Sequence, residues 1–437
     1  MDSALVTDVR QCDTECVRTT DRKLHCVAIG LSMTLGLAIT SFYDIVASSD
    51  AGSSTMATAS PVSATFLPSG EGWILSGYHC STGVCLAVKR TMDDGRTWTP
   101  LHLPSGLRAV TNSSGASYFP LVQQNIYFAD AKDGWIYGSV SPVGSVGDTN
   151  LTFDAEIWST HDRGASWSVL DTKSLGMKFD VLSLSASRGS IYAISWLKGQ
   201  TFGLWRSSVT NDSWQRVSTP TLTSAAGGSN MEGVLTFTGA DGWLMLGNDR
   251  GTTAAVRLLS SGRWVKWNAP CQTVGGSFAA LVAFNSTTLA DVCTIGGFGG
   301  DVAPGTPHYL KQQTNWVFVS HDAGLTFEPT SQVMADGSSE FLDSIPSLPA
   351  SPAPGRLLIA KSVSHGLKTS DHLYLTRNGG KTWRSVYASP LTSFFPVIQS
   401  VKFTSSSLGY AIVQRTSTTS ELIISWDGGW AWHASAT

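Results

Sequence analysis

Hydrophobic positions along this chain fall into short apolar runs, which polar, glycine-containing turns separate. From about residue 63 to the C-terminus, the runs have the length of β-strands and alternate with turn residues. This pattern predicts many short antiparallel strands over 63–437. One longer apolar run, about 27–43, lies near the N-terminus and has a length typical of a helix.

An eight-residue motif, Ser/Thr-x-Asp-x-Gly-x-Thr/Ser-Trp, recurs through the strand-rich part of the chain. The Asp side chain can accept hydrogen bonds from N–H groups just ahead, the Gly can adopt positive φ, and the Trp can anchor the turn. The motif therefore predicts a self-capped turn between two strands. Its five clear copies contain Asp93, Gly95 and Trp98; Asp162, Gly164 and Trp167; Asp322, Gly324 and Phe327; Asn378, Gly380 and Trp383; Asp427, Gly429 and Trp432; two worn copies end at Trp214 and Trp264.

A second motif precedes the turns: a Phe, a polar turn and a strand that begins with Gly and an aromatic residue. It occurs from Phe66 to Trp73, from Phe128 to Trp135, from Phe237 to Trp243 and from Phe403 to Tyr410. Together the motifs define a four-stranded unit of about 50 residues, and such units repeat radially in β-propellers. The sequence predicts an all-β, seven-bladed propeller with four-stranded antiparallel blades near 63–102, 124–172, 179–217, 232–267, 277–329, 340–387 and 399–437.

Two details of the ring follow from the same pattern. The proline-rich stretch 346–355 interrupts blade 6, because proline cannot donate a hydrogen bond to a neighbouring strand. The chain begins in a first strand and ends in a fourth, so closure is expected to rest on contact between blades 1 and 7, with 52–62 as a further contributor.

The turn motif resembles the Asp-box, or BNR, repeat of the sialidase-like propellers over about 63–437. The pairing of the two motifs is closest in style to the photosystem II stability/assembly factor-like proteins and to WD- or YVTN-like bacterial surface propellers. The resemblance implies a propeller whose Asp-boxes are structural and lie away from the usual ligand site. It leaves the function open, because sialidases, xyloglucanases, receptors and non-catalytic assembly factors share the repeat.

A glycosidase is the main enzymatic alternative. A sialidase-like site would need three converging Arg residues, a Tyr–Glu pair and an Asp acid, with an Arg-Ile-Pro type motif before the first Asp-box. No Arg occurs between Arg22 and Arg90, so that motif is missing. A pair of carboxylates on the ring would support glycoside hydrolysis instead. We therefore assign no catalytic residue.

The loops between the second and third strands of a blade are the expected place for a ligand, since long loops often carry function. Three of them look enlarged: 141–156, 296–315 and 362–372. They could bind a ligand or a divalent metal if they converge, or remain solvated loop residues. Their candidate residues are Asp148, Asp154 and Glu156; Asp301, His308 and Tyr309; His365, Asp371 and His372.

The N-terminus predicts export. A polar segment, 1–23, carries Arg10, Arg18, Arg22 and Lys23, and an apolar segment, 24–46, follows it. Positive charge before the apolar run favours an N-in, C-out signal anchor. A cleaved signal peptide is the alternative, which would give a secreted protein. Residues 47–62 are small and polar and are expected to form a flexible stalk before the propeller at 63–437.

Cysteine usage agrees with export. Cys80 and Cys85 flank a short turn and could form a disulfide across a hairpin, and Cys271 and Cys293 are the second available pair. Cys12, Cys16 and Cys26 precede or begin the apolar run. Their spacing fits no standard zinc pattern, so free cytoplasmic thiols are favoured over a zinc site.

The charge composition limits the classes of partner that the chain can bind. Charged residues make up 14% of the chain, and 29 basic against 32 acidic residues give a net charge of −3. No basic field is available for a nucleic-acid backbone. We expect a membrane-tethered, non-catalytic scaffold at the cell envelope that binds a protein or an envelope glycan and needs no cofactor. The alternative is a carbohydrate-binding or glycan-hydrolysing propeller.

Overall fold

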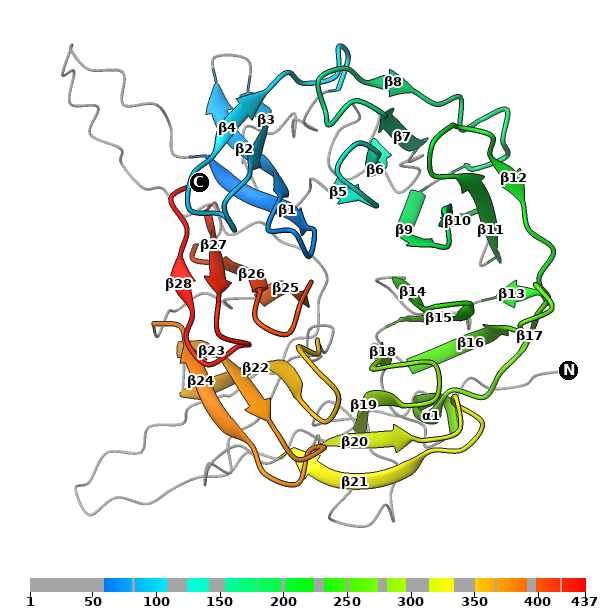
Figure 1. The fold of residues 1–437 in the computed structure, drawn as a ribbon, viewed down its shortest axis with the longest axis vertical. Coiled ribbons are helices and arrows are strands. Elements are labelled where there is room, and N and C mark those ends of the chain that lie inside the picture. Colours follow the sequence, from blue (N-terminus) through cyan, green and yellow to red (C-terminus); the bar gives the residue numbers. More distant parts are fainter. Residues whose placement is uncertain are drawn as a thin grey trace, which may run out of the picture. The chain divides into compact units, whose positions relative to one another are not determined.

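Seven antiparallel sheets are arranged as the blades of a ring in the computed structural model (Figure 1), and this confirms the predicted all-β, seven-bladed propeller. Within the described part of the chain, no helix has the length and apolar character needed to cross a bilayer. The predicted helix at 24–46 lies outside that part. The structure describes residues 59–80, 83–107, 124–140, 154–178, 180–197, 201–223, 232–248, 251–273, 281–295, 314–333, 350–365, 368–390, 398–416 and 419–437.

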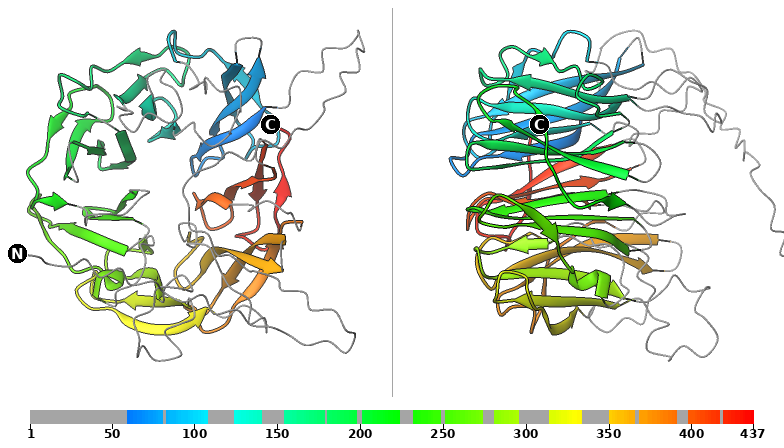
Figure 2. Two further views of the ribbon diagram at one scale, coloured as in Figure 1. Left: turned by 180° about the vertical axis from the view of Figure 1, so that it is seen from behind. Right: turned by 90° about the vertical axis from the view of Figure 1, so that its right-hand side faces the viewer.

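In blades 1, 2 and 4 the strands follow chain order from the first strand to the last, and in blade 3 the first four strands do so while the fifth pairs with the third. Figure 2 shows the ring from behind and from the side. Blade 1 contains β1 (Ser60–Phe66), β2 (Gly72–Cys80), β3 (Gly83–Thr91) and β4 (Thr99–Leu101); blade 2, β5 (Asn125–Phe128), β6 (Gly134–Val140), β7 (Asp154–Thr160) and β8 (Ser168–Val169); blade 3, β9 (Asp180–Ser187), β10 (Ser190–Trp196), β11 (Thr201–Ser208), β12 (Gln215–Arg216) and β13 (Leu222–Thr223); blade 4, β14 (Glu232–Thr238), β15 (Asp241–Asn248), β16 (Gly251–Leu258) and β17 (Trp264–Lys266).

The last three blades continue this order after one short helix, α1 (Pro270–Thr273), which lies in the connection from blade 4 to blade 5. Blade 5 contains β18 (Leu281–Ala283), β19 (Leu289–Ile295), β20 (Thr314–Ser320) and β21 (Glu328–Val333); blade 6, β22 (Leu357–His365), β23 (Lys368–Thr376) and β24 (Arg384–Ala388); blade 7, β25 (Ile398–Phe403), β26 (Gly409–Gln414), β27 (Ser420–Ser425) and β28 (His433–Ala434).

Three features depart from the prediction of seven four-stranded blades that start at residue 63. Blade 6 has three strands among the described residues, and its first strand is reduced there to one bridge from Ala350 to Leu358. The nearby Pro352 and Pro354 cannot donate to a sheet. Blade 3 gains β13, which pairs with β11. Blade 1 starts at Ser60, so the end of the predicted stalk belongs to β1, where a register shift accommodates Pro61.

The second sequence motif builds the joint between neighbouring blades. The Phe at the end of a first strand packs against the second strand of the preceding blade: Phe128 stacks on Trp73 with ring centroids 3.7 Å apart. The Gly that opens the second strand leaves room for this ring, because a Cβ on Gly134 would lie 2.5 Å from Phe128. The motif is therefore a packing device that repeats around the ring.

The ring closes through the same joint, without a strand shared between the two ends of the chain. Phe66 of blade 1 packs on Tyr410 of blade 7, with centroids 4.9 Å apart, inside a core cluster drawn from both blades. The Trp426 indole N–H donates to the Asp94 carbonyl at 3.1 Å, and the Trp98 indole N–H donates to Ser435 Oγ at 3.0 Å. The predicted contact between blades 1 and 7 is present.

Two disulfides brace the described residues. Cys80 and Cys85 join the ends of β2 and β3, where Cys80 pairs with Gly83 in the register of the hairpin. Cys271 and Cys293 join α1 to β19, and both are fully buried. The first bond thus braces the β2–β3 hairpin within blade 1, and the second braces the connection that enters blade 5.

Candidate functional site

The two faces of the ring are distinguished by their turns. The turns after the first and third strands of a blade meet on one face, because the Asp94 N–H donates to the Gly70 carbonyl at 3.0 Å and the Arg163 N–H donates to the Lys132 carbonyl at 2.9 Å. We call this face the Asp-box face. The second strands end, and the third strands begin, on the opposite face, which is where the sequence analysis placed a ligand.

The Asp-box turns satisfy their own polar groups. In blade 1 the Asp93 carboxylate accepts bonds from the Thr97 N–H at 2.8 Å, from Thr97 Oγ1 at 2.6 Å and from Thr91 Oγ1 at 2.7 Å. The Trp98 indole N–H donates to the Gly95 carbonyl at 3.1 Å. Sequence reasoning missed one feature, which is that Asp94, the residue before the Gly, also has positive φ (57°).

Acid should weaken the charged turns and spare the turn built on Asn378. Hydrogen bonds, led by those from Thr97 and Thr326, lower the pKa of Asp93 and Asp322 to about 2. Their contribution to stability is complete above the ordinary pKa and is lost as the pH falls through the lowered one. The double variant Asp93→Asn, Asp322→Asn should therefore lose less unfolding free energy than wild type as the pH falls from about 4 to about 2. Chemical denaturation at each pH measures this.

The matched control is Asn378→Asp, which should add acid sensitivity to a turn that now lacks a carboxylate. In wild type, Asn378 Oδ1 accepts from the Thr382 N–H at 2.9 Å and its amide donates to Thr382 Oγ1 at 3.0 Å, so the turn keeps its bonds without charge. Acid curves of the double variant that run parallel to those of wild type would contradict the assignment.

Of the candidate ligand residues, the structure describes the side chains of Glu156, Asp371 and His372, and these three do not come together. Asp148, Asp301, His308 and Tyr309 lie outside the described residues, as do the side chains of Asp154 and His365. Asp154 and Glu156 belong to β7, because pairing of that strand with β6 begins at Asp154. Glu156 is half-buried in blade 2, and burial raises the pKa of its carboxyl. Asp371 and His372 lie in blade 6, which is not adjacent to blade 2.

The expectation of an enlarged loop at 362–372 is wrong. β22 pairs with β23 as far as His365 and Lys368, so only two residues separate the paired strands. His365, Asp371 and His372 are therefore strand residues. The polar side chains in this stretch suggested a loop, but strand pairing is made by the backbone and tolerates polar residues near the end of a hairpin.

The alternation of β23 separates Asp371 from His372. Leu373, two residues from Asp371, packs in the core shared with blade 7, whereas Tyr374, two residues from His372, packs in the core shared with blade 5. His372 Nε2 lies 2.9 Å from Ser370 Oγ on the blade 5 side. Asp371 thus belongs to the interface between blades 6 and 7.

A polar cluster lies at that interface, on the side away from the Asp-box face. It consists of Asp371, Tyr387, Arg415 and Glu421, and we call it the blade 6–7 cluster. Asp371 is buried, and its backbone holds Ser389, since the Asp371 N–H donates to Ser389 Oγ at 2.8 Å. Arg415 follows the end of β26 and donates from Nε to Glu421 Oε2 at 2.7 Å, and its Nη2 contacts the same oxygen.

The charged groups of the blade 6–7 cluster shift the pKa of the Tyr387 phenol. Burial raises the pKa of Tyr387, Arg415 opposes that rise, and the carboxylates of Glu421 and Asp371 add to it. The Tyr387 phenol therefore keeps its proton at neutral pH. The Tyr387 hydroxyl and the Asp371 carboxyl are buried. The paired Arg415 guanidinium and Glu421 carboxylate are partly exposed, and these are the groups suited to hydrogen bonding with a ligand.

Sequence reasoning missed three of these four residues. Tyr387 and Glu421 lie within strands and Arg415 directly after one, where polar side chains are usual on exposed positions. The available signal was a cluster of Arg and Glu around one hairpin, which is common on protein surfaces. Only the packing of blade 6 against blade 7 brings the residues together.

One trio among the described residues has the chemistry of a metal site. The ligand atoms of Cys271, Asp291 and Cys293 lie within 4.8 Å of one another. The two cysteines are joined to each other, so neither has a thiolate to offer a metal in this state.

Several solved proteins of low sequence identity are similar in structure to this chain. No protein-family model and no curated protein sequence matches the chain. A polysaccharide lyase of family PL25, an ulvan lyase, is 10% identical, with a TM-score of 0.53 over 86% of this chain and 95% of that chain. YCF48 bound to a D1 peptide is 16% identical, with a TM-score of 0.48 over 85% and 93%. The α-L-arabinofuranosidase of family GH93 from Fusarium graminearum is 12% identical, with a TM-score of 0.40 over 82% and 88%. The lyase comparison shows a common propeller fold.

Proposed function

We propose that this chain is a non-catalytic scaffold of the cell envelope, tethered through 24–46, that binds a protein partner at the blade 6–7 cluster. The observation that supports a binding role is the state of Tyr387. A general base needs a pKa near the working pH, whereas this phenol keeps its proton because burial and two carboxylates raise its pKa. Arg415 is already paired to Glu421, so the cluster holds its charges in fixed geometry.

The residue types favour a protein partner. Tyr and Arg are enriched among the residues that contribute most to protein–protein binding, because each combines a large contact area with directional hydrogen bonds. A rigid ring, closed by side-chain packing between blades 1 and 7, presents such residues with little loss of conformational entropy.

Cross-linking of the full-length chain in native membranes tests the proposal. A captured partner should bind the Arg415→Met variant roughly tenfold or more weakly. Arg263→Met is the matched control, because Arg263 is an exposed arginine in the turn of blade 4 and should leave binding unchanged. Equal binding by both variants and wild type would contradict the assignment of the cluster.

A glycan is the second candidate, because the partly exposed guanidinium of Arg415 and carboxylate of Glu421 can also hydrogen-bond to sugar hydroxyls. The full-length chain should be incubated with sialosides, glucans and envelope polysaccharides, and both retention and product release recorded. Cleavage of any of them would overturn the non-catalytic proposal. Retention without cleavage, weakened by Arg415→Met, would replace the protein partner by a glycan.

A further inference from the structure

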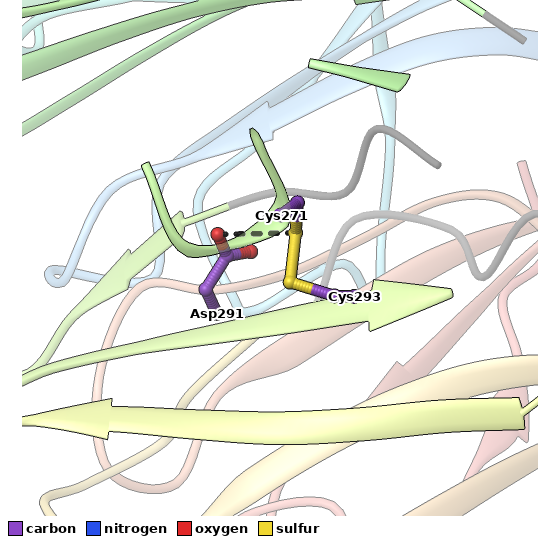
Figure 3. A group of neighbouring side chains, drawn as sticks. All are labelled: Cys271, Asp291 and Cys293. Carbon is purple, nitrogen blue, oxygen red and sulfur yellow. Dashed lines mark hydrogen bonds between the residues drawn. A yellow bond between two sulfur atoms is a disulfide. The ribbon is translucent and has the colours of Figure 1, made fainter. Parts of the chain in front are cut away.

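A buried carboxyl group lies against the disulfide that joins blade 5 to the preceding connection (Figure 3). Cys271 belongs to α1 and Cys293 to β19, and Asp291 precedes Cys293 by two residues on the same side of the strand. All three residues have 0% of their surface exposed. Asp291 Oδ2 is 3.4 Å from Cys271 Sγ.

No opposite charge compensates this carboxyl group among the described residues. Asp291 Oδ1 has no hydrogen-bond partner there. The elements packed against Asp291 (β18, β20 and α1) contribute no titratable side chain, since Cys271 is disulfide-bonded. Arg257 of the neighbouring β16 is directed to the Trp243 ring. An ionised carboxylate is costly in such surroundings, and burial raises the pKa of Asp291 to about 8. Asp291 is therefore protonated at neutral pH.

The position of this proton matters for sulfur chemistry. A disulfide sulfur carries no hydrogen, so the contact between Oδ2 and Sγ can be a hydrogen bond only if the carboxyl group donates it. Reduction of a disulfide leaves one sulfur as a thiolate, which needs a proton to become a thiol. In this structure Asp291 Oδ2 lies 3.4 Å from Cys271 Sγ, the sulfur on which that thiolate would form.

We propose that Cys271–Cys293 is a redox-sensitive bond and that Asp291 donates a proton to Cys271 when a dithiol reduces it. One sulfur of the dithiol, as a thiolate, attacks Cys293 Sγ. The S–S bond breaks, its electron pair leaves on Cys271 Sγ, and the Asp291 proton moves to that sulfur.

The second sulfur of the dithiol completes the exchange. It attacks the mixed disulfide, so that the dithiol becomes a disulfide and Cys293 leaves as a thiolate. The two protons that the dithiol lost to water balance the proton that Cys293 takes up and the one that restores Asp291. Two electrons and two protons thus pass from the dithiol to the protein.

The Cys271–Cys293 bond ties the connection between blades 4 and 5 to blade 5. Reduction removes the disulfide cross-link between α1 and β19, so that the connection entering blade 5 is joined to that blade through the backbone alone among the described residues. Because both sulfurs are fully buried, the attack must follow a local opening of α1, a single turn that begins with Pro270. The Cys80–Cys85 bond differs, since both of its cysteines are partly exposed at a hairpin end.

The test is the reduction of both disulfides in the full chain with dithiothreitol at pH 6 to 9, followed by alkylation and mass spectrometry of each pair. Rates are divided by the concentration of dithiothreitol thiolate. The Cys271–Cys293 rate in wild type should fall as the pH rises through the Asp291 titration. In Asp291→Asn it should be roughly tenfold lower at neutral pH and independent of pH.

Cys80–Cys85 is the control within the same molecule, and its rate should be the same in wild type and variant. A change in local opening alone would shift the Cys271–Cys293 rate by one factor at every pH, so the shape of the profile identifies proton transfer. If Asp291→Asn does not fold, Asp291→Ser takes its place. A wild-type pH profile in the variant, or a bond that resists reduction until the whole chain unfolds, would overturn the proposal.

Discussion

Replacement of Phe66 by alanine is expected to remove about 3–5 kcal/mol of unfolding free energy. The Phe66 ring is buried, lies 4.9 Å from Tyr410 of blade 7 and 5.9 Å from Trp98 of its own blade, and fills the space above Gly72. Its loss leaves a cavity at the one joint that holds the two ends of the propeller together. Urea unfolding followed by tryptophan fluorescence measures the loss.

The matched control is Phe128→Ala, which removes the same side chain from the joint between blades 1 and 2. If the ring closes through an ordinary joint, both variants should lose a similar free energy. Hydrogen exchange separates them, since Phe66→Ala should expose β1 and β27, which face each other across the closure. A loss below about 1 kcal/mol for Phe66→Ala would mean that side-chain packing at this joint does not close the ring.

The fold could be predicted because two local motifs repeat along the chain. The Asp-box is readable because its hydrogen bonds link residues two to four positions apart, as between Thr91, Asp93 and Thr97. The Phe and Gly of the second motif also lie close in sequence. The Phe packs on a residue of another blade. The motif could therefore be recognised in the sequence, but its role as a joint between blades could not.

The candidate site could not be predicted in the same way. Tyr387 and Arg415 are 28 positions apart in different blades, and only the packing of β24 beside the hairpin of blade 7 brings them together. Polar residues in 362–372 suggested a loop, whereas backbone pairing continues to His365 and Lys368. Asp291 was not singled out at all, because one acidic residue in an apolar strand has no sequence pattern.

Asp291→Asn is expected to stabilise the protein at pH 8, against the usual effect of substitutions in a core. Burial raises the folded-state pKa of Asp291 from its ordinary 3.8 to about 8. Between those values the folded chain holds a proton that the unfolded chain has released. The contribution of Asp291 to stability is therefore fully present below pH 3.8, falls by up to about 1.4 kcal/mol for each pH unit above it, and levels off beyond pH 8.

An asparagine at 291 has nearly the same shape and does not titrate, so the difference between the two proteins isolates this one group from every other titration. Urea denaturation with both disulfides intact, at pH 5, 6, 7, 8 and 9, should show the variant gaining on wild type up to about pH 8 and keeping a constant advantage above it. Stability curves that stay parallel over this range would show that Asp291 is ionised in the folded protein. Its proton would then be absent from the Cys271 sulfur at neutral pH, and the disulfide beside it would be a plain structural link.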